Sequence, residues 1–327
     1  MKAMTIPEYG EPSVLTLAEV PTPTPGETEL LIEVHAAALN PVDTKIRSGK
    51  FRAPVELPLV PGFDVSGVVR AIGAGVTRFR PGDAVYASPP LFKPGAHAEM
   101  VVVDEQVAAR KPTSLSHVEA AALPLALITA WEVAYDRARL EEGQTVLIHA
   151  AAGGVGHLAV QLAAARGCTV IGTASSDESF ALLDELKVDH TINYKKEDVA
   201  ARVKELTDGK GCDAVFDFVG QAVFEASIEL VKLHGCLCTI VGVPEGVALN
   251  PLFLKSASLH PEFMGSTAMA GGIPKNQGGI LKEAASMVDA GTLKPHVSKT
   301  FALDQLAEAH TLQETQGATG KLVINLR

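Results

Sequence analysis

The sequence predicts an α/β protein with two parts, a β-rich domain and a doubly wound domain in which helices cover both faces of a parallel sheet. Before Ser114, short runs of valine, isoleucine and leucine alternate with prolines, which is typical of short strands joined by tight turns. From Gln144 onward, strand-like and helix-like segments alternate, as they do around a parallel sheet. An apolar fraction of 47% against 20% charged residues indicates a large core.

The β-rich part begins with two clear strand candidates, residues 29–39 ("ELLIEVHAAAL") and 65–73 ("VSGVVRAIG"). Proline-containing stretches at 21–26 and 80–88 mark turns. Short strands with frequent turns favour a compact, barrel-like domain over a helical one.

A change of character follows at residues 114–140, which are alanine-rich and helical in pattern. Pro124 is expected to interrupt this helical region, because proline lacks the backbone N–H that a helix interior needs. Ser116 and Glu119 have the spacing of a capping box, so a helix is predicted to start there.

The doubly wound part is predicted from five short apolar runs, too uniformly apolar for strands with one face in water. They lie at 145–150, 168–175, 190–194, 212–220 and 236–242. The tail adds expected helices at 279–290 and 303–313 and a final strand at 321–326, "KLVINL".

A glycine-rich turn joins the first of these strands to a helix. The strand leads into "AAGGVG", and apolar residues follow at helical spacing, namely Val155, Leu158, Ala159 and Leu162. Strand, glycine turn and helix in this order are the context that a dinucleotide-binding fingerprint requires. Such a turn lets the backbone approach a pyrophosphate, and the free N–H groups at the helix start face the phosphates. An ordinary strand-to-helix turn is the alternative, because Ala151 occupies the first glycine position.

The end of the next strand indicates which nicotinamide cofactor is expected. An acidic residue there would bind the NAD ribose, but the sequence places the hydroxyls of Ser175 and Ser176 at this point. Asp177 follows and is interpreted as a helix N-cap. Tyr194 and the lysines after it end the neighbouring strand. We therefore predict NADP rather than NAD.

Charge and cysteine usage exclude several classes of protein. The formal net charge of −10 disfavours nucleic acid as a partner. No signal peptide or membrane span is visible, and the four cysteines read as buried thiols of a reducing compartment, so a cytoplasmic protein is expected.

Taken together, several stretches in order make the chain resemble the medium-chain dehydrogenases/reductases, specifically the zinc-independent, quinone-oxidoreductase-like (zeta-crystallin-like) branch. They are "AAALNPVDTKIRSG", "PLVPGFDVSGVV", "AAALPLALITAWEVAY", "HAAAGGVGHLAVQLA", "INYKKED" and "GKLVINL". The resemblance covers essentially the full length. It implies a GroES-like catalytic domain at 1–119, completed by 264–327, and a Rossmann dinucleotide-binding domain at 120–263.

The resemblance also bears on metal binding. Zinc-dependent members place a cysteine and a His-Glu pair in the catalytic domain, where the corresponding stretches of this chain read Asn40-Pro41 and Gly62-Phe63-Asp64, and no cysteine precedes Cys168. Cys236 and Cys238 form a C-x-C pair without further partners, so buried core thiols are the favoured interpretation. No metal site is expected.

By resemblance, the activity would be hydride transfer from NADPH to a quinone or to the activated C=C bond of an α,β-unsaturated carbonyl. Asn40 and Lys45 are the catalytic candidates, although Lys45 fits a solvated loop lysine equally well. His149 is interpreted as a strand-end histidine bonded to the backbone rather than as a base. The cofactor-binding candidates are Asn40, Thr129, Gly153, Gly154, Val155, Gly156, Ser175, Ser176, Tyr194, Val219, Gly242, Val243, Phe263, Met264 and Gly265.

Two other functions remain open at this stage. Some relatives carry tyrosines where this chain has Lys45 and Phe51, which leaves room for a non-catalytic NADPH-binding protein. An enoyl-thioester reductase is the closer alternative. The resemblance suggests a small-molecule substrate and a homodimer, formed through edge strands of the Rossmann sheets.

Overall fold

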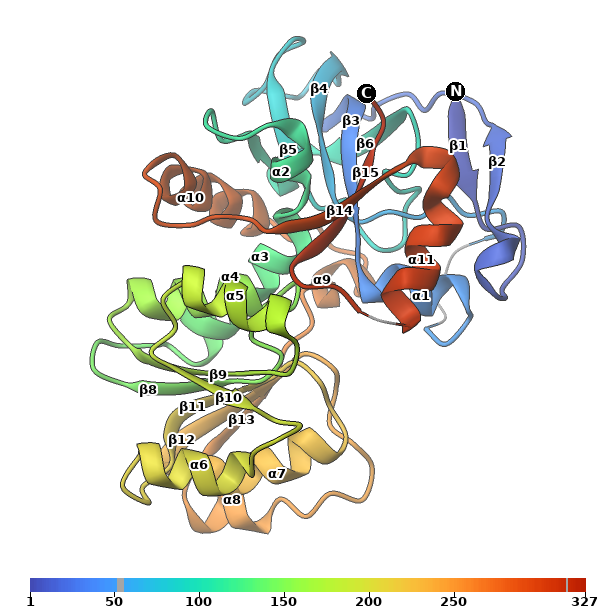
Figure 1. The fold of residues 1–327 in the computed structure, drawn as a ribbon. Helices are drawn as coiled ribbons and strands as arrows, with labels where there is room; N and C mark the ends of the chain where they lie inside the picture. Colours follow the sequence, from blue (N-terminus) through green and yellow to red (C-terminus); the bar gives the residue numbers. More distant parts are fainter. Residues whose placement is uncertain (52–55, 316) are drawn as a thin grey trace. The chain divides into compact units, whose positions relative to one another are not determined.

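The computed structural model describes residues 1–51, 56–315 and 317–327, and it divides into two compact units (Figure 1). We call Met1–Ile128 with Gly265–Arg327 the β unit, and Thr129–Met264 the α/β unit. The chain therefore leaves the β unit once and later returns to complete it.

The β unit is organised by a seven-stranded sheet within the described residues, in the order β14-β15-β3-β4-β5-β7, with β6 paired to β3. These strands are β3 (Glu29–Leu39), β4 (Val65–Ile72), β5 (Ala84–Ala87), β6 (Met100–Asp104), β7 (Ala108–Arg110), β14 (Val297–Ala302) and β15 (Lys321–Asn325). A separate hairpin joins β1 (Lys2–Thr5) to β2 (Thr16–Glu19). The long strand β3 pairs antiparallel with β15, so the last strand of the chain lies beside one of the first.

Short helices surround this sheet. They are α1 (Pro41–Arg47), α2 (His117–Ala121), α9 (Ser266–Met269), α10 (Gln277–Asp289) and α11 (Leu306–Thr315), with single turns η1 (Pro12–Val14), η2 (Glu105–Val107) and η4 (Leu303–Gln305). The predicted capping box is confirmed at α2, where Ser116 accepts the N–H of Glu119 and donates its own N–H to that carboxylate. The predicted break is also confirmed, because α2 stops before Pro124 and α3 (Pro124–Trp131) starts there.

The α/β unit contains one parallel sheet in the order β10-β9-β8-β11-β12-β13. Its strands are β8 (Thr145–Ile148), β9 (Thr169–Ala174), β10 (His190–Asn193), β11 (Cys212–Asp217), β12 (Val231–Thr239) and β13 (Ser258–Pro261). The first five coincide with the predicted runs, although β12 begins at Val231, five residues before the predicted start at 236. The sixth, β13, was missed because it is short, half-exposed and contains His260 and Pro261, which give no apolar signal. The strand order reverses between β8 and β11, which is where doubly wound sheets bind their ligands.

Helices cover both faces of this sheet, with α4 (Gly156–Ala165) and α5 (Asp177–Glu185) on one side (Figure 1). On the other lie α6 (Val199–Leu206), α7 (Ala222–Leu230) and α8 (Asn250–Leu254). A π-helical segment, η3 (Glu132–Arg137), follows α3. All four cysteines are buried and free. In the described part of the chain, no helix has the length and apolar character needed to cross a membrane.

Candidate functional site

Most of the predicted cofactor-binding residues share one position, the carboxyl ends of the parallel strands in the α/β unit. The strands β8, β9, β10, β11 and β12 are followed in turn by the glycine turn, Ser175 and Ser176, Tyr194, Val219, and Gly242 with Val243. Phe263 and Met264 come just after β13. Carboxyl ends of parallel strands meet at one edge of a sheet, so these predicted residues are gathered at one edge. Thr129 is buried on α3, and Gly265 begins the returning segment of the β unit.

The glycine turn has one position, Gly156, that has no room for a side chain. The N–H of Gly153 donates to the carbonyl of Ala150 at 2.9 Å, which closes the turn. A Cβ on Gly156 would lie 2.1 Å from that carbonyl oxygen and 2.8 Å from the oxygen of Ala151. Within the described residues, the N–H groups of Gly154 and Val155 donate to no other group of the chain. The turn thus presents unused N–H donors at the start of α4.

The helix after the turn differs from the prediction of a single buried face. Residues 156–163 are all buried, His157 and Gln161 included. The ring of His157 lies 2.9 Å from the carbonyl of Gly153, and Gln161 donates to the carbonyl of His157 at 2.7 Å. These bonds satisfy the two polar side chains, which lets the first eight residues of the helix be buried, whereas Ala164 and Ala165 at its end are exposed.

The hydroxyls after β9 have different tasks. Ser176 is the N-cap of α5, since its Oγ accepts the N–H of Ser179 at 3.2 Å. The interpretation of Asp177 as the N-cap is therefore wrong; Asp177 is the first residue inside the helix. Ser175 instead donates to the hydroxyl of Tyr194 at 2.9 Å, and Tyr194 is half-exposed at the end of β10. Ser175 and Tyr194 are thus joined at the sheet edge.

The loop after β11 depends on Asp217, which sequence reasoning did not single out. Its Oδ1 accepts the N–H groups of Val219 at 3.0 Å and Gly220 at 2.8 Å, and its Oδ2 accepts the hydroxyl of Thr239 at 3.1 Å. One buried carboxylate therefore shapes the ends of two neighbouring strands. A lone aspartate at the end of an apolar run was the available signal.

His149 lies just past β8, and its environment differs from the predicted backbone bond. Its Nδ1 lies 3.5 Å from the hydroxyl of Thr173, and its Nε2 has no partner among the described residues. Burial lowers the pKa of His149 to about 4, so the ring is neutral at physiological pH.

In the β unit, Asn40 lies in a cluster of buried charged groups. Asn40 immediately precedes α1, Asp64 immediately precedes β4, and Lys321 is the first residue of β15. The Nζ atom of Lys321 donates to Asn40 Oδ1 at 2.5 Å and to Asp64 Oδ2 at 3.1 Å. Asn40 Nδ2 donates to the same Asp64 oxygen at 2.8 Å. Three segments far apart in the sequence thus meet through one triangle of hydrogen bonds.

A second carboxylate, Asp43, supports this triangle from the first turn of α1. Its Oδ2 accepts the N–H of Asn40 at 2.8 Å, and its Oδ1 accepts the N–H of Gly62 at 3.0 Å. Burial, with a contribution from the nearby Asp64 carboxylate, raises the pKa of Asp43 to about 7. Burial also raises the pKa of Asp64, against the opposing effect of Lys321.

The other catalytic candidate, Lys45, is exposed on α1. The sequence reasoning placed Asn40 in the site but missed that Asp64 and Lys321 hold it. Asp64 within "PGFDVSGVV" and Lys321 at the head of "KLVINL" are charged residues in apolar runs, and this is the signal that could have identified them.

The positions that the resemblance relates to zinc ligands hold side chains with other bonds or without a ligand atom. Asn40 and Asp64 are already bonded to an ammonium group, and Phe63 offers no ligand atom. Across residues 1–51, 56–315 and 317–327, no group of three or more histidine, cysteine or acidic side chains is placed to hold a metal.

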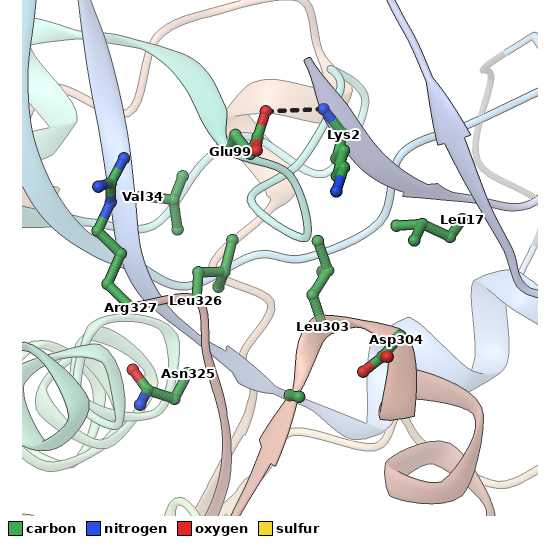
Figure 2. Close-up of a pocket in the computed structure, with 10 residues that line it drawn as sticks. Lys2, Leu17, Val34, Glu99, Leu303, Asp304, Asn325, Leu326 and Arg327 are labelled. Atoms are coloured by element: carbon green, nitrogen blue, oxygen red, sulfur yellow. Dashed lines mark hydrogen bonds between the residues drawn. The ribbon is translucent and has the colours of Figure 1, made fainter.

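A hollow of about 470 Å³ lies elsewhere on the β unit (Figure 2). Lys2 and Glu99 line it, joined by a 2.8 Å bond from the backbone N–H to the carboxylate, with Leu303 and Arg327 nearby. None of the predicted site residues lines this hollow.

Two family models match the chain. The model described as "Alcohol dehydrogenase GroES-like domain" matches residues 26–113, and the model described as "Zinc-binding dehydrogenase" matches residues 154–275. The first match falls in the β unit and the second largely in the α/β unit.

Individual relatives match over nearly the whole length. A quinone oxidoreductase of Pseudomonas aeruginosa is 36% identical over 328 residues, covering 99% of each chain. A 2-methylene-furan-3-one reductase of Solanum lycopersicum is also 36% identical, covering 99% of this chain and 79% of its own. The crystal structure of Escherichia coli quinone oxidoreductase complexed with NADPH superposes with a TM-score of 0.90 at 28% identity, covering all of both chains.

Proposed function

Because the chain belongs to the medium-chain dehydrogenase/reductase superfamily, in its quinone-oxidoreductase-like branch, we propose that it is an NADPH-dependent oxidoreductase. Its acceptor would be a quinone or the activated C=C bond of an α,β-unsaturated carbonyl. The observation that carries the proposal is the glycine turn at the reversal point of the parallel sheet, with no room for a Cβ at Gly156 and with unused N–H donors beside it.

The residues at the sheet edge fit a dinucleotide. The N–H groups of Gly154 and Val155 at the start of α4 would bind the pyrophosphate, since a helix start carries partial positive charge. The exposed valines after β11 and β12, Val219 and Val243, offer apolar surface for the nicotinamide end. When bound, NADPH supplies a hydride at its nicotinamide ring.

The preference for NADP rests on Ser175 and Tyr194. The Ser175 hydroxyl donates to that of Tyr194 at 2.9 Å, so the Tyr194 O–H would donate to a 2′-phosphate. Lys195 and Lys196 follow directly in the chain. Asp177 opposes this preference, because a carboxylate in the first turn of α5 repels a phosphate. We therefore infer that NADPH is preferred over NADH and that the Asp177 carboxylate reduces this preference.

In the β unit, the chain's contribution would come from Asn40. Its amide keeps one N–H and one lone pair after its bonds to Asp64 and Lys321. A fixed amide of this kind would orient the nicotinamide or donate to the oxygen on which charge develops during hydride transfer. Lys45, exposed on the same helix, is the second catalytic candidate; its positive charge would favour the negative charge that develops on the acceptor during hydride transfer.

The test is oxidation of NADPH by purified protein with a panel of quinones, 2-alkenals and enoyl thioesters, repeated with NADH. We expect turnover with quinones or alkenals, a lower KM for NADPH than for NADH, and a loss of kcat in an Asn40→Leu control that still binds NADPH. Faster turnover of enoyl thioesters would instead assign an enoyl reductase. Saturable NADPH binding without turnover of any acceptor would overturn the proposal in favour of a non-catalytic NADPH-binding protein.

A homodimer is part of the proposal. In the described part of the α/β unit, β13 pairs on one side only, with β12, so its other edge is open to a second copy. Light scattering after size exclusion should give twice 34.2 kDa; a monomeric mass would contradict it.

A further inference from the structure

The amide of Asn40 can be held in only one orientation by its neighbours. Lys321 Nζ can only donate hydrogen bonds, and an ionised Asp64 can only accept them. Turning the amide over would place Nδ2 against the ammonium and Oδ1 against the carboxylate. Because one partner lies 2.5 Å from Oδ1 and the other 2.8 Å from Nδ2, both contacts would become repulsive. The pair of charges therefore acts as a lock on the amide.

Burying these charged groups contributes little to stability, which indicates that they are present for a functional reason. Asn40 and Lys321 are each 3% exposed and Asp64 is fully buried. Buried ion pairs are frequently no more stabilising than apolar residues of the same volume. The apolar cluster beside the triangle, which includes Leu39, Phe63 and Leu322, could have continued through it.

The remaining contacts fix the backbone rather than the amide. Asp43 binds the N–H groups of Asn40 and Gly62, and Asp64 Oδ1 accepts the N–H of Leu125 at 2.6 Å. Among the residues that the structure describes, the Lys321 ammonium group bonds to no backbone atom; it donates to the Asn40 and Asp64 side chains. The Lys321 side chain therefore fixes the orientation of the Asn40 amide and not the position of the backbone.

We propose that Lys321 is a positioning residue, which acts through the catalytic candidate Asn40 by holding the remaining N–H and lone pair of its amide in one defined orientation. The effect of Lys321 on kcat rests on the proposed function. The orientation of the Asn40 amide does not, because it can be measured without turnover.

Two variants distinguish a role of Lys321 in orienting the Asn40 amide from a role in only neutralising the Asp64 carboxylate. Lys321→Met alone leaves Asp64 buried and unpaired, so this variant can fail to fold for a trivial reason. The double variant Lys321→Met/Asp64→Asn removes both charges and should fold, yet the amide introduced at position 64 can bond Asn40 in either orientation. We expect its thermal unfolding to stay close to that of the parent, while kcat falls about 100-fold and the Kd for NADPH changes less than about threefold.

A background lacking the amide provides the matched control. In an Asn40→Leu chain, adding the double substitution should lower kcat no further, because Lys321 acts through Asn40. Lys321→Arg keeps the positive charge but moves the hydrogen-bond donors, so its kcat should lie between that of the parent and that of the double variant. Parental kcat in the double variant, or a further loss of kcat in the Asn40→Leu background, would overturn the proposal.

The orientation is read directly by NMR on protein labelled with ¹⁵N-asparagine. The sequence has only five asparagines, so the side-chain signals of Asn40 can be assigned by their loss in Asn40→Leu. In the parent, the Nδ2 proton bonded to Asp64 should exchange slowly with solvent, and in the double variant it should exchange at least about tenfold faster. Unchanged exchange would overturn the proposal. If exchange accelerates while the parent turns over no acceptor, the proposed function fails and the positioning of Asn40 stands.

Discussion

The two units position their functional groups by different means. The α/β unit does so with backbone: glycines that permit a tight turn, N–H groups at a helix start, and loops at the ends of parallel strands. The β unit does so with buried charged side chains contributed by distant segments, namely Asp43, Asp64 and Lys321. A backbone device is sensitive to a single added methyl group, whereas a charge device is sensitive to protonation and to the loss of one partner.

The units also differ in degree in their buried histidines, since the α/β unit has one such ring, His149, with one unpartnered nitrogen among the described residues and a pKa lowered to about 4. The β unit buries His97 and His310, whose four ring nitrogens have no partner among the described residues. Burial lowers the pKa of His97 to about 3 and that of His310 to about 2. Buried histidines with such unsatisfied nitrogens are tolerated only while neutral, so the β unit should be the more acid-sensitive of the two.

The largest expected effect tests the backbone device. Gly156→Ala would place a Cβ 2.1 Å from the Ala150 carbonyl oxygen. We expect the unfolding free energy to fall by about 3 kcal/mol, as measured by chemical denaturation. We also expect NADPH binding, measured by fluorescence titration, to be lost. Gly279→Ala, on α10 with nothing within 4 Å of the added Cβ, is the matched control and should be neutral or slightly stabilising. If Gly156→Ala bound NADPH as tightly as the parent, the claim that the α/β unit depends on its backbone for cofactor binding would be wrong.

The next effect tests the acid sensitivity of the β unit. Because the pKa of His310 in the fold lies below its ordinary value of 6.5, its neutral form stabilises fully above pH 6.5, and that contribution is lost as pH falls toward 2. Between pH 7 and pH 5, His310→Leu should therefore lose about 2 kcal/mol less stability than the parent in urea denaturation. Asp43 works the opposite way: its raised pKa adds stability as pH falls from about 7 toward 3.8. Equal pH slopes for parent and variant would show that His310 does not limit acid stability.

A smaller effect separates the two serines after β9. Among the described residues, the Ser175 hydroxyl bonds Tyr194 alone. Ser175→Ala should therefore reduce the preference for NADPH over NADH about tenfold, the value of one hydrogen bond to a charged group. Ser176→Ala removes the N-cap of α5 and should lower stability by about 1 kcal/mol with little change in preference. Steady-state KM values and thermal melts measure both. The reverse assignment would make Ser176 the cofactor residue, as the sequence had suggested alongside Ser175.

The smallest effect compares capping across the units. Ser116→Ala removes the cap of α2 in the β unit and should cost about 1 kcal/mol. Its loss should exceed that of Ser176→Ala slightly, because Ser116 also takes part in a reciprocal bond with Glu119, whereas α5 has no such acidic partner. Chemical denaturation of the two variants side by side checks this order.

The sequence was informative wherever a local pattern determines the structure. The strands of the α/β unit, the capping box at Ser116 and the glycine turn all follow from residues close together in the chain. It failed at β13, where four half-exposed residues take their conformation from pairing with β12, and at Asp177, where either of two neighbours could cap α5. The Asn40 triangle could not be derived, because no local pattern relates residue 40 to residues 64 and 321.

The pairing of β3 with β15 also has a consequence for how the chain is made. About 280 residues separate Leu39 from Leu322, its partner across the sheet, so at about 5–20 residues per second the ribosome needs roughly 15–60 s to supply that partner. The α/β unit, finished at Met264, is complete before then. During that interval β3 exposes an apolar edge, and Lys321 is still unavailable to neutralise Asp64. We therefore expect nascent chains stopped before residue 321 to bind chaperones through the β unit while their α/β unit already resists proteolysis.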